Sequence, residues 1–226
     1  MAGREGWLEE RIEISKLAWL GTRIVPRGIG WWYTLGSATL VSFLMLILSG
    51  SFLMMNYSPS PDHAWDSVQY ISNVVPFGSF IRSLHHWSAY AMILLIGLHA
   101  LRVFFMAAYR YPRELNWVIG VFLLLEVSFM SFTGYLLPWD QKAYWATTVA
   151  SHIAGETPVI GSFVETVLIG GTQIGAVTLT RFFTLHVVII PALIVLFISA
   201  HIMLVIKLGI SPPPGTAKAM SGDYES

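Results

Sequence analysis

Four long apolar stretches divide the chain, and each is long enough to cross a lipid bilayer as a helix. A membrane helix needs about 20 mostly apolar residues. The second and third stretches contain one charge each, Arg102 and Glu126. The pattern predicts an all-α membrane protein, a four-helix bundle, and not a water-soluble core. The four stretches are Tyr33 to Tyr57, Ser83 to Tyr109, Leu115 to Leu137 and Leu179 to Ile206.

The polar segments around these stretches define the expected domain organisation. Charges alternate with large apolar residues over Gly6–Leu20, which is typical of an amphipathic helix lying in the membrane interface. The two long connections, Ser58–Arg82 and Pro138–Thr178, are expected to hold short helices on the outer surface. We therefore expect an N-terminal segment at residues 1–32, a membrane domain at 33–210 and a polar tail at 211–226.

Basic residues outside the spans or near their ends predict the orientation in the membrane. Cytoplasmic loops carry an excess of Lys and Arg. One side would hold nine of them and the other only three, so both termini are expected to be cytoplasmic. The nine are Arg4, Arg11, Lys16, Arg23, Arg27, Arg110, Arg113, Lys207 and Lys218, and the three are Arg82, Lys142 and Arg181.

Composition narrows the function classes. Hydrophobic residues make up 55% of the 226 residues and charged residues 12%, against about 25% charged in a soluble domain. The formal net charge is zero, which argues against a nucleic-acid-binding protein. The chain has no cysteine, which excludes disulfides, thiolate metal sites and a cysteine nucleophile within it.

Histidines recur at nearly the same spacing in two of the spans. His85 and His99 are 14 residues apart in the second span, and His186 and His201 are 15 apart in the fourth. At about 3.6 residues per turn, each pair lies on nearly one helix face. Because both helices run in the same direction, His85 is expected to face His186 near the outer surface and His99 to face His201 near the inner one. Two opposed histidines can ligate a haem iron from both sides.

Glycines in the other two spans repeat this spacing. Gly36 and Gly50 are 14 residues apart, as are Gly120 and Gly134. Glycine lets a flat macrocycle approach the helix backbone closely. Gly50 and Gly134 are expected at the outer level, and Gly36 and Gly120 at the inner level.

Each of these residues also has a simpler explanation. An intramembrane histidine often forms a hydrogen bond between helices, and glycines are common packing residues in membrane helices. The coincidence of one period in all four spans favours two layers of haem ligation. The other three histidines fit less well: His63 and His152 fall in the outer connections, and His86 points about 100° away from His85.

Arginines near the ends of the spans are candidate partners for haem carboxylates. Arg82 and Arg181 precede His85 and His186 at the outer level, while Arg113 and Arg102 lie near the inner level. The alternative is that they are ordinary arginines at a membrane boundary.

Several motifs resemble the cytochrome b family, and in detail the short cytochrome b of cytochrome bf-type complexes. The resemblance covers nearly the whole chain. It rests on Arg82-Ser-Leu-His-His-Trp-Ser-Ala89, Tyr111-Pro-Arg-Glu-Leu115, Thr133-Gly-Tyr-Leu-Leu-Pro-Trp-Asp-Gln141, Thr178-Leu-Thr-Arg-Phe182, Leu185-His186 and Lys207-Leu-Gly-Ile-Ser211.

The resemblance implies a subunit of a quinol-oxidising bc- or bf-type respiratory or photosynthetic complex. Its cofactors would be an outer, low-potential haem b on His85 and His186 and an inner, high-potential haem b on His99 and His201. The family's outer quinol pocket maps partly onto Phe132, Tyr135 and Ala146.

The rest of that pocket lies in helices that this chain lacks, so the resemblance also implies a partner similar to subunit IV. Further implied partners are a Rieske iron–sulfur protein or equivalent and a c-type cytochrome, in a homodimeric complex. The membrane would be a bacterial inner membrane or a thylakoid-like one.

The chain also departs from this family pattern. Thr34 stands where the bf-type chain has a cysteine that tethers a third, inner haem, so only a non-covalent third haem remains possible. Arg23 and Lys207 keep the basic character expected near the inner quinone, although Trp19 and Ile206 replace an expected acidic residue and an arginine.

Two other functions remain open at this point. One is a two-haem membrane anchor of a hydrogenase or dehydrogenase. The other is a haem-free transporter in which the four span histidines and Glu126 relay protons. The glycine pairs and the Pro138-Trp-Asp-Gln141 loop favour the quinol-oxidising subunit.

Glu126 lies between the two expected haem layers, where an apolar residue is usual. It is either a protonated glutamate hydrogen-bonded to another helix or a group that tunes the haems. Glu126→Gln is expected to preserve both haems and to shift a midpoint potential, measured by redox titration. Unchanged potentials and turnover would remove the tuning role.

Overall fold

A computed structural model describes residues 29–213, and this part of the chain is helical, without a β-strand. The expected amphipathic helix at Gly6–Leu20, Arg23 and the chain after residue 213 lie outside these residues. The account below concerns the compact unit Trp31–Gly209.

Four helical segments are long and apolar enough to cross a membrane, which confirms the expected fold class. The second is α5 (Gly78–Phe105) and the third is α6 (Glu114–Leu136). The first is a 3₁₀ turn, Trp31–Thr34, that continues into α3 (Leu35–Met54). The fourth consists of α9 (Ala176–Thr184), a π-helical turn (Leu185–Ile189) and α10 (Ile190–Leu208).

The helix bounds differ from the apolar stretches at several ends. α5 begins at Gly78, five residues before Ser83, because its first turns carry polar residues such as Ser79 and Arg82 that hydropathy alone does not assign to a span. The first span ends at Met54 and not at Tyr57. The sequence did not predict the π-helical turn in the fourth span, because hydropathy does not distinguish such a turn from an α-helical one.

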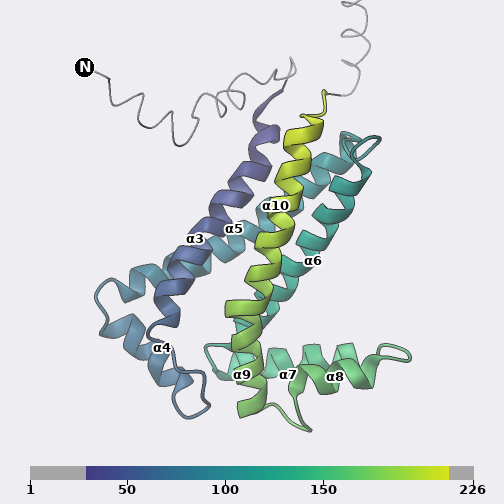
Figure 1. Ribbon diagram of the computed structural model, residues 1–226. Helices are drawn as coiled ribbons and strands as arrows, with labels where there is room; N and C mark the ends of the chain where they lie inside the picture. The colour runs from purple at the N-terminus through teal and green to yellow at the C-terminus, as the bar shows by residue number, and fades with distance from the viewer. Residues whose placement is uncertain (1–28, 214–226) are drawn as a thin grey trace, which may run out of the picture. The chain divides into compact units, whose positions relative to one another are not determined.

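The bundle consists of two closely packed helix pairs, α3 with α5 and α6 with α10 (Figure 1). Between the pairs lies an apolar core to which each helix contributes two buried residues. These are Phe43 and Leu46, Met92 and Ile96, Leu123 and Val127, and Ile190 and Ile194. Burial of such side chains stabilises the bundle by packing, since lipid tails are as apolar as the core itself.

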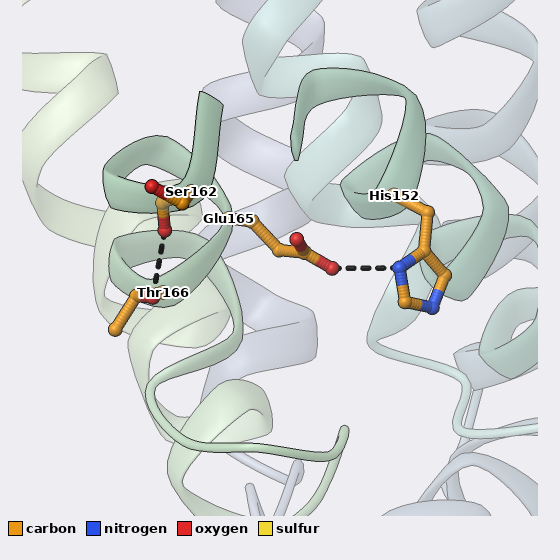
Figure 2. A network of polar contacts seen from close by, with 4 residues as sticks. All are labelled: His152, Ser162, Glu165 and Thr166. Atoms are coloured by element: carbon orange, nitrogen blue, oxygen red, sulfur yellow. Dashed lines mark hydrogen bonds and ion pairs between the residues drawn. The ribbon is translucent and has the colours of Figure 1, made fainter. Parts of the chain in front are cut away.

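Short helices gather at one end of the bundle, where α3 and α6 end (Figure 1). They are α4 (Ala64–Asn73), α7 (Gln141–Gly155) and α8 (Gly161–Ile169). The Asp140 carboxylate starts α7 by accepting a hydrogen bond from the backbone N–H of Ala143 at 2.7 Å. Figure 2 shows α7 and α8 joined by His152 and Glu165, whose Nδ1 and Oε1 atoms are 2.7 Å apart.

Tyr57 links the two helix pairs at this same end. Its hydroxyl donates a 2.6 Å hydrogen bond to the carbonyl of Leu137, 80 residues further along the chain. Its ring stacks on Phe183 at 5.5 Å between centroids. Burial raises the pKa of the Tyr57 phenol, because the phenolate would lose its solvation there.

Tyr57→Phe should lower the free energy of unfolding by about 0.5–1.5 kcal/mol, the usual contribution of one such hydrogen bond. The raised pKa makes the neutral phenol the stable folded form. Its stabilisation is therefore complete below about pH 10, the pKa of an unfolded tyrosine, and is lost as the pH rises above it. Denaturation in detergent at pH 8 and pH 11 would measure both effects.

Tyr70→Phe is the matched control, because Tyr70 is 52% exposed on α4. It should leave stability unchanged at pH 8. An equal loss of stability in both variants would contradict the role of the Tyr57 bond.

Candidate functional site

The structure brings the four span histidines together as two facing pairs. The His85 and His186 rings have centroids 6.3 Å apart, with an angle of 71° between their planes. The His99 and His201 rings have centroids 6.4 Å apart, at 78°. Each pair joins α5 to the fourth span, so the histidines bridge the two helix pairs of the bundle.

These separations fit one metal ion between each pair of imidazoles. With metal–nitrogen bonds of about 2.0 Å and ring centres roughly 1.1 Å behind each nitrogen, two axial imidazoles have centroids about 6.2 Å apart. The observed 6.3 and 6.4 Å match this value. Two imidazoles hydrogen-bonded directly to each other would have their nitrogens only about 3 Å apart. Their centroids would then be closer together than the observed values.

Hydrogen bonds hold two of the rings with one nitrogen left over for a ligand. Ser49 donates its proton to the carbonyl of Met45, so its oxygen is available to accept from Nδ1–H of His85 at 3.0 Å. His186 donates Nδ1–H to the carbonyl of Met130, also at 3.0 Å. These bonds leave the lone pair of Nε2 free to bind a metal, which is the usual arrangement for ligating histidines.

The four glycines lie directly against the four histidines. A Cβ added at Gly36 would lie 3.1 Å from Cε1 of His99, and one at Gly50 would lie 3.0 Å from Cε1 of His85. On the other helix pair, the corresponding distances are 3.4 Å from Gly120 to His201 and 2.5 Å from Gly134 to His186. The glycines thus give each ring room against the neighbouring helix, a contact that the sequence did not indicate.

A cavity opens beside the His85–His186 pair, and its lining is almost entirely apolar. His85 and His186 line it together with residues of α3, α5 and α6, and Ser131 is the other polar residue in its wall. The apolar lining residues are Phe43, Leu46, Ala89, Met92, Val127 and Met130. An apolar cavity with two imidazoles in its wall fits a flat hydrophobic macrocycle that carries a metal.

The candidate arginines differ in what they contact. Arg113 donates to the carbonyls of Leu208 and Gly209, and Arg181 donates to the carbonyl of Val167. Arg82 makes a long 3.4 Å contact with the hydroxyl of Ser72.

Arg102 lies 3.6 Å above the Tyr33 ring, and its buried Nε and Nη2 atoms have no hydrogen-bond partner in the described part of the chain. Of these four arginines, only Arg102 has buried guanidinium nitrogens without a hydrogen-bond partner among residues 29–213.

The residues expected around the quinones lie at the surface, apart from Phe132, which packs against a buried cluster that includes Leu136, Leu179 and Phe182. Phe132 packs edge-to-face on Phe182 at 5.3 Å, Tyr135 is 46% exposed and Ala146 is exposed. Lys207 is exposed near the end of α10.

Glu126 does not show the interhelical hydrogen bond that the sequence allowed for. Its Oε2 atom is buried and has no partner among residues 29–213.

Sequence reasoning did not identify Ser49 or the Met130 carbonyl as partners of the histidines. Ser49 lies one residue before Gly50, so the glycine register does place it at the right depth. A backbone carbonyl has no sequence signal. The role of the Met130 carbonyl becomes visible only in the packed bundle.

These features define the class: an integral membrane protein with two facing, half-buried histidine pairs suited to b-type haem. The sequence profile described as "Cytochrome b/b6/petB" matches residues 20–209. The chain is 45% identical over 210 residues to cytochrome b6 of Heliobacterium modesticaldum, covering 92% of this chain and 99% of that one.

It is 43% identical over 217 residues to the menaquinol:cytochrome c reductase cytochrome b subunit of Bacillus subtilis, covering 92% and 96% of the two chains. A solved structure, of a hyperthermophilic respiratory complex III, matches with a TM-score of 0.87 and 32% identity over 93% of this chain. The present chain spans only 56% of that one.

The chain belongs to the cytochrome b family, in the group of bc- and bf-type subunits of oxidoreductase complexes. Membership implies that it binds haem b. The two histidine pairs fit that cofactor in separation and in the donor atoms they present.

Gly134→Ala should disturb haem binding at the His85–His186 pair, because the new Cβ would lie 2.5 Å from the His186 ring. Gly97→Ala on α5 is the matched control, since its Cβ would meet no atom within 4 Å. Reduced-minus-oxidised absorbance should show roughly half the b-type signal in the first variant and nearly all of it in the second. Equal losses in the two variants would contradict this geometry.

Proposed function

We propose that this chain passes electrons across the membrane between an outer quinol-oxidation site and an inner quinone-reduction site, as the cytochrome b subunit of a bc/bf-type complex. The observation that carries the proposal is the pair of histidine couples, one at each end of the apolar core, at the separation that two axial ligands require. Two such sites stacked across a bilayer suit transmembrane electron transfer.

Each residue of the site has a defined task in this proposal. His85 and His186 would hold the outer haem b, and His99 and His201 the inner one. Each bound haem would accept and release one electron. Ser49 and the Met130 carbonyl orient the outer imidazoles through their Nδ1 atoms.

The arginines would hold the haem carboxylates at the two levels. Arg82 and Arg181 are proposed at the outer level and Arg113 at the inner one. Arg102 joins Arg113 there, because its buried guanidinium nitrogens lack partners in the described structure and a carboxylate would satisfy them.

The quinol-oxidising site requires a second membrane subunit. Phe132, Tyr135 and Ala146 would form this chain's part of the outer pocket, and the exposure of Tyr135 and Ala146 leaves them available to another chain. Arg23 and Lys207 are proposed at the inner quinone.

The complex would also contain a Rieske protein or equivalent and a c-type cytochrome, and would be a homodimer. We place residues 33–210 in a bacterial inner or thylakoid-like membrane. Residues 1–32 and 211–226 would be cytoplasmic, on the evidence of the basic loops.

The two alternative functions receive less support. A haem-free transporter does not explain why each histidine ring faces a glycine and pairs at a metal-bridging distance. The relatives with 43–45% identity are named as cytochrome b6 or a menaquinol:cytochrome c reductase subunit, and not as anchors of a hydrogenase or dehydrogenase.

Histidine substitutions test the proposal directly. His99→Ala should remove only the higher-potential haem and His85→Ala only the lower-potential one, since each variant loses one axial ligand. Redox titration of the b-type absorbance in the purified protein would distinguish them. His86→Ala is the matched control: His86 is exposed on the same helix and packs on Tyr90, and it should retain both haems.

Loss of the same haem in the His85 and His99 variants would disprove the two-level pairing. Absence of any b-type band from the unaltered chain would reject the proposed function altogether.

A further inference from the structure

The fourth span differs from the other three in the spacing of its two paired residues. Its histidines are 15 apart, whereas the histidines of α5 and the glycines of α3 and α6 are 14 apart. In a regular α-helix one extra residue rotates a side chain by about 100°. His186 and His201 would then differ in relative direction from every other pair, yet both meet their partners at nearly equal distances, 6.3 and 6.4 Å.

The position of the extra residue follows from the buried residue that lies midway between the paired residues of each span. Phe43, Met92 and Val127 lie seven residues from the glycine or histidine on either side, and all three are buried in the apolar core. The corresponding core residue of the fourth span is Ile194, which is fully buried. It lies seven residues before His201 but eight after His186. The extra residue therefore falls between His186 and Ile194.

A wide turn occurs in that interval. Leu185–Ile189 is π-helical, and the backbone N–H of Ile190 donates to the carbonyl of Leu185, five residues earlier. Such a turn contains one more residue than an α-helical turn and lets the following helix continue in its former direction. Pro191 follows directly, and it has no N–H to donate to the carbonyl of Val187, four residues before it.

We propose that the π-helical turn Leu185–Ile189, with Pro191 behind it, is a positioning device that absorbs the extra residue of the fourth span. It aligns His186, Ile194 and His201 as His85, Met92 and His99 are aligned in α5. The inference rests on the proposed haem-binding function, because alignment of the two histidines matters only if both face a shared ligand.

Two single-residue deletions test the device. Val188 is 58% exposed and lies within the wide turn, while Leu196 is 62% exposed and lies between Ile194 and His201. Both deletions shorten the histidine spacing to 14, so the count alone cannot distinguish them. Deletion of Val188 should convert the wide turn to an α-helical turn and retain both haems. No wide turn lies between Ile194 and His201, so deletion of Leu196 should rotate His201 relative to Ile194 by about 100°. The chain should then lose the inner haem.

Haem content and midpoint potentials of the purified chains are the first readout. A second readout is independent of haem: Phe122→Cys and Phe197→Cys, introduced into this cysteine-free chain, replace rings that stack at 6.1 Å between α6 and α10. A short bifunctional thiol reagent should cross-link them as efficiently after deletion of Val188 as before it. The yield should fall after deletion of Leu196.

Loss of a haem or of the cross-link on deletion of Val188 would overturn the inference, as would equal behaviour of the two deletions. Failure of the Val188-deleted chain to accumulate counts against it as well, because the inference requires that this deletion be tolerated. If the undeleted chain held no haem, the proposed function would fail, while the cross-link would still report whether the wide turn sets the alignment.

Discussion

An imidazole in a membrane interior is stabilised when its nitrogens have hydrogen-bond partners or a ligand, and the placement of the four span histidines organises the rest of the structure. Nδ1 of His85 and of His186 finds a partner within the chain, in Ser49 or in the Met130 carbonyl. Nε2 remains for a ligand between the helix pairs. The helices have to present these rings at two depths, and glycines opposite them keep the neighbouring backbones close enough. Spacing, helix pairing and core composition all follow from this arrangement.

The sequence predicted the parts of this arrangement that depend on helical periodicity. Four apolar stretches and their order give the bundle, and the 14-residue repeats place residues at two levels of it. The facing of His85 with His186, and of His99 with His201, was expected from the same periodicity, and the structure brings these rings together. Periodicity carries this information because a membrane helix satisfies its own backbone and therefore keeps its geometry over its whole length.

The parts that were not predicted depend on departures from that regular geometry or on contacts between helices. The hydropathy of the segment Leu-His-Val-Val-Ile is compatible with a regular α-helix and does not predict a π-helical turn. The sequence did not predict the hydrogen-bond and ring partners of the arginines either. Arg113 binds the last carbonyls of the fourth span, while Arg102 stacks on Tyr33. Which arginine is free to bind an anion depends on where neighbouring helix ends lie, and a single sequence does not encode this in any local pattern.

The division of the bundle into two tight helix pairs has a consequence for assembly. α3 with α5 is a hairpin of consecutive spans and can associate as soon as both are inserted, and α6 with α10 can do so later. Each histidine couple takes one ring from each hairpin, so a ligand bound by both rings joins two units that were made at different times. Such a ligand stabilises the joined state over the separated one by mass action. A ligand held by both rings would therefore favour the completed bundle over its two separate hairpins.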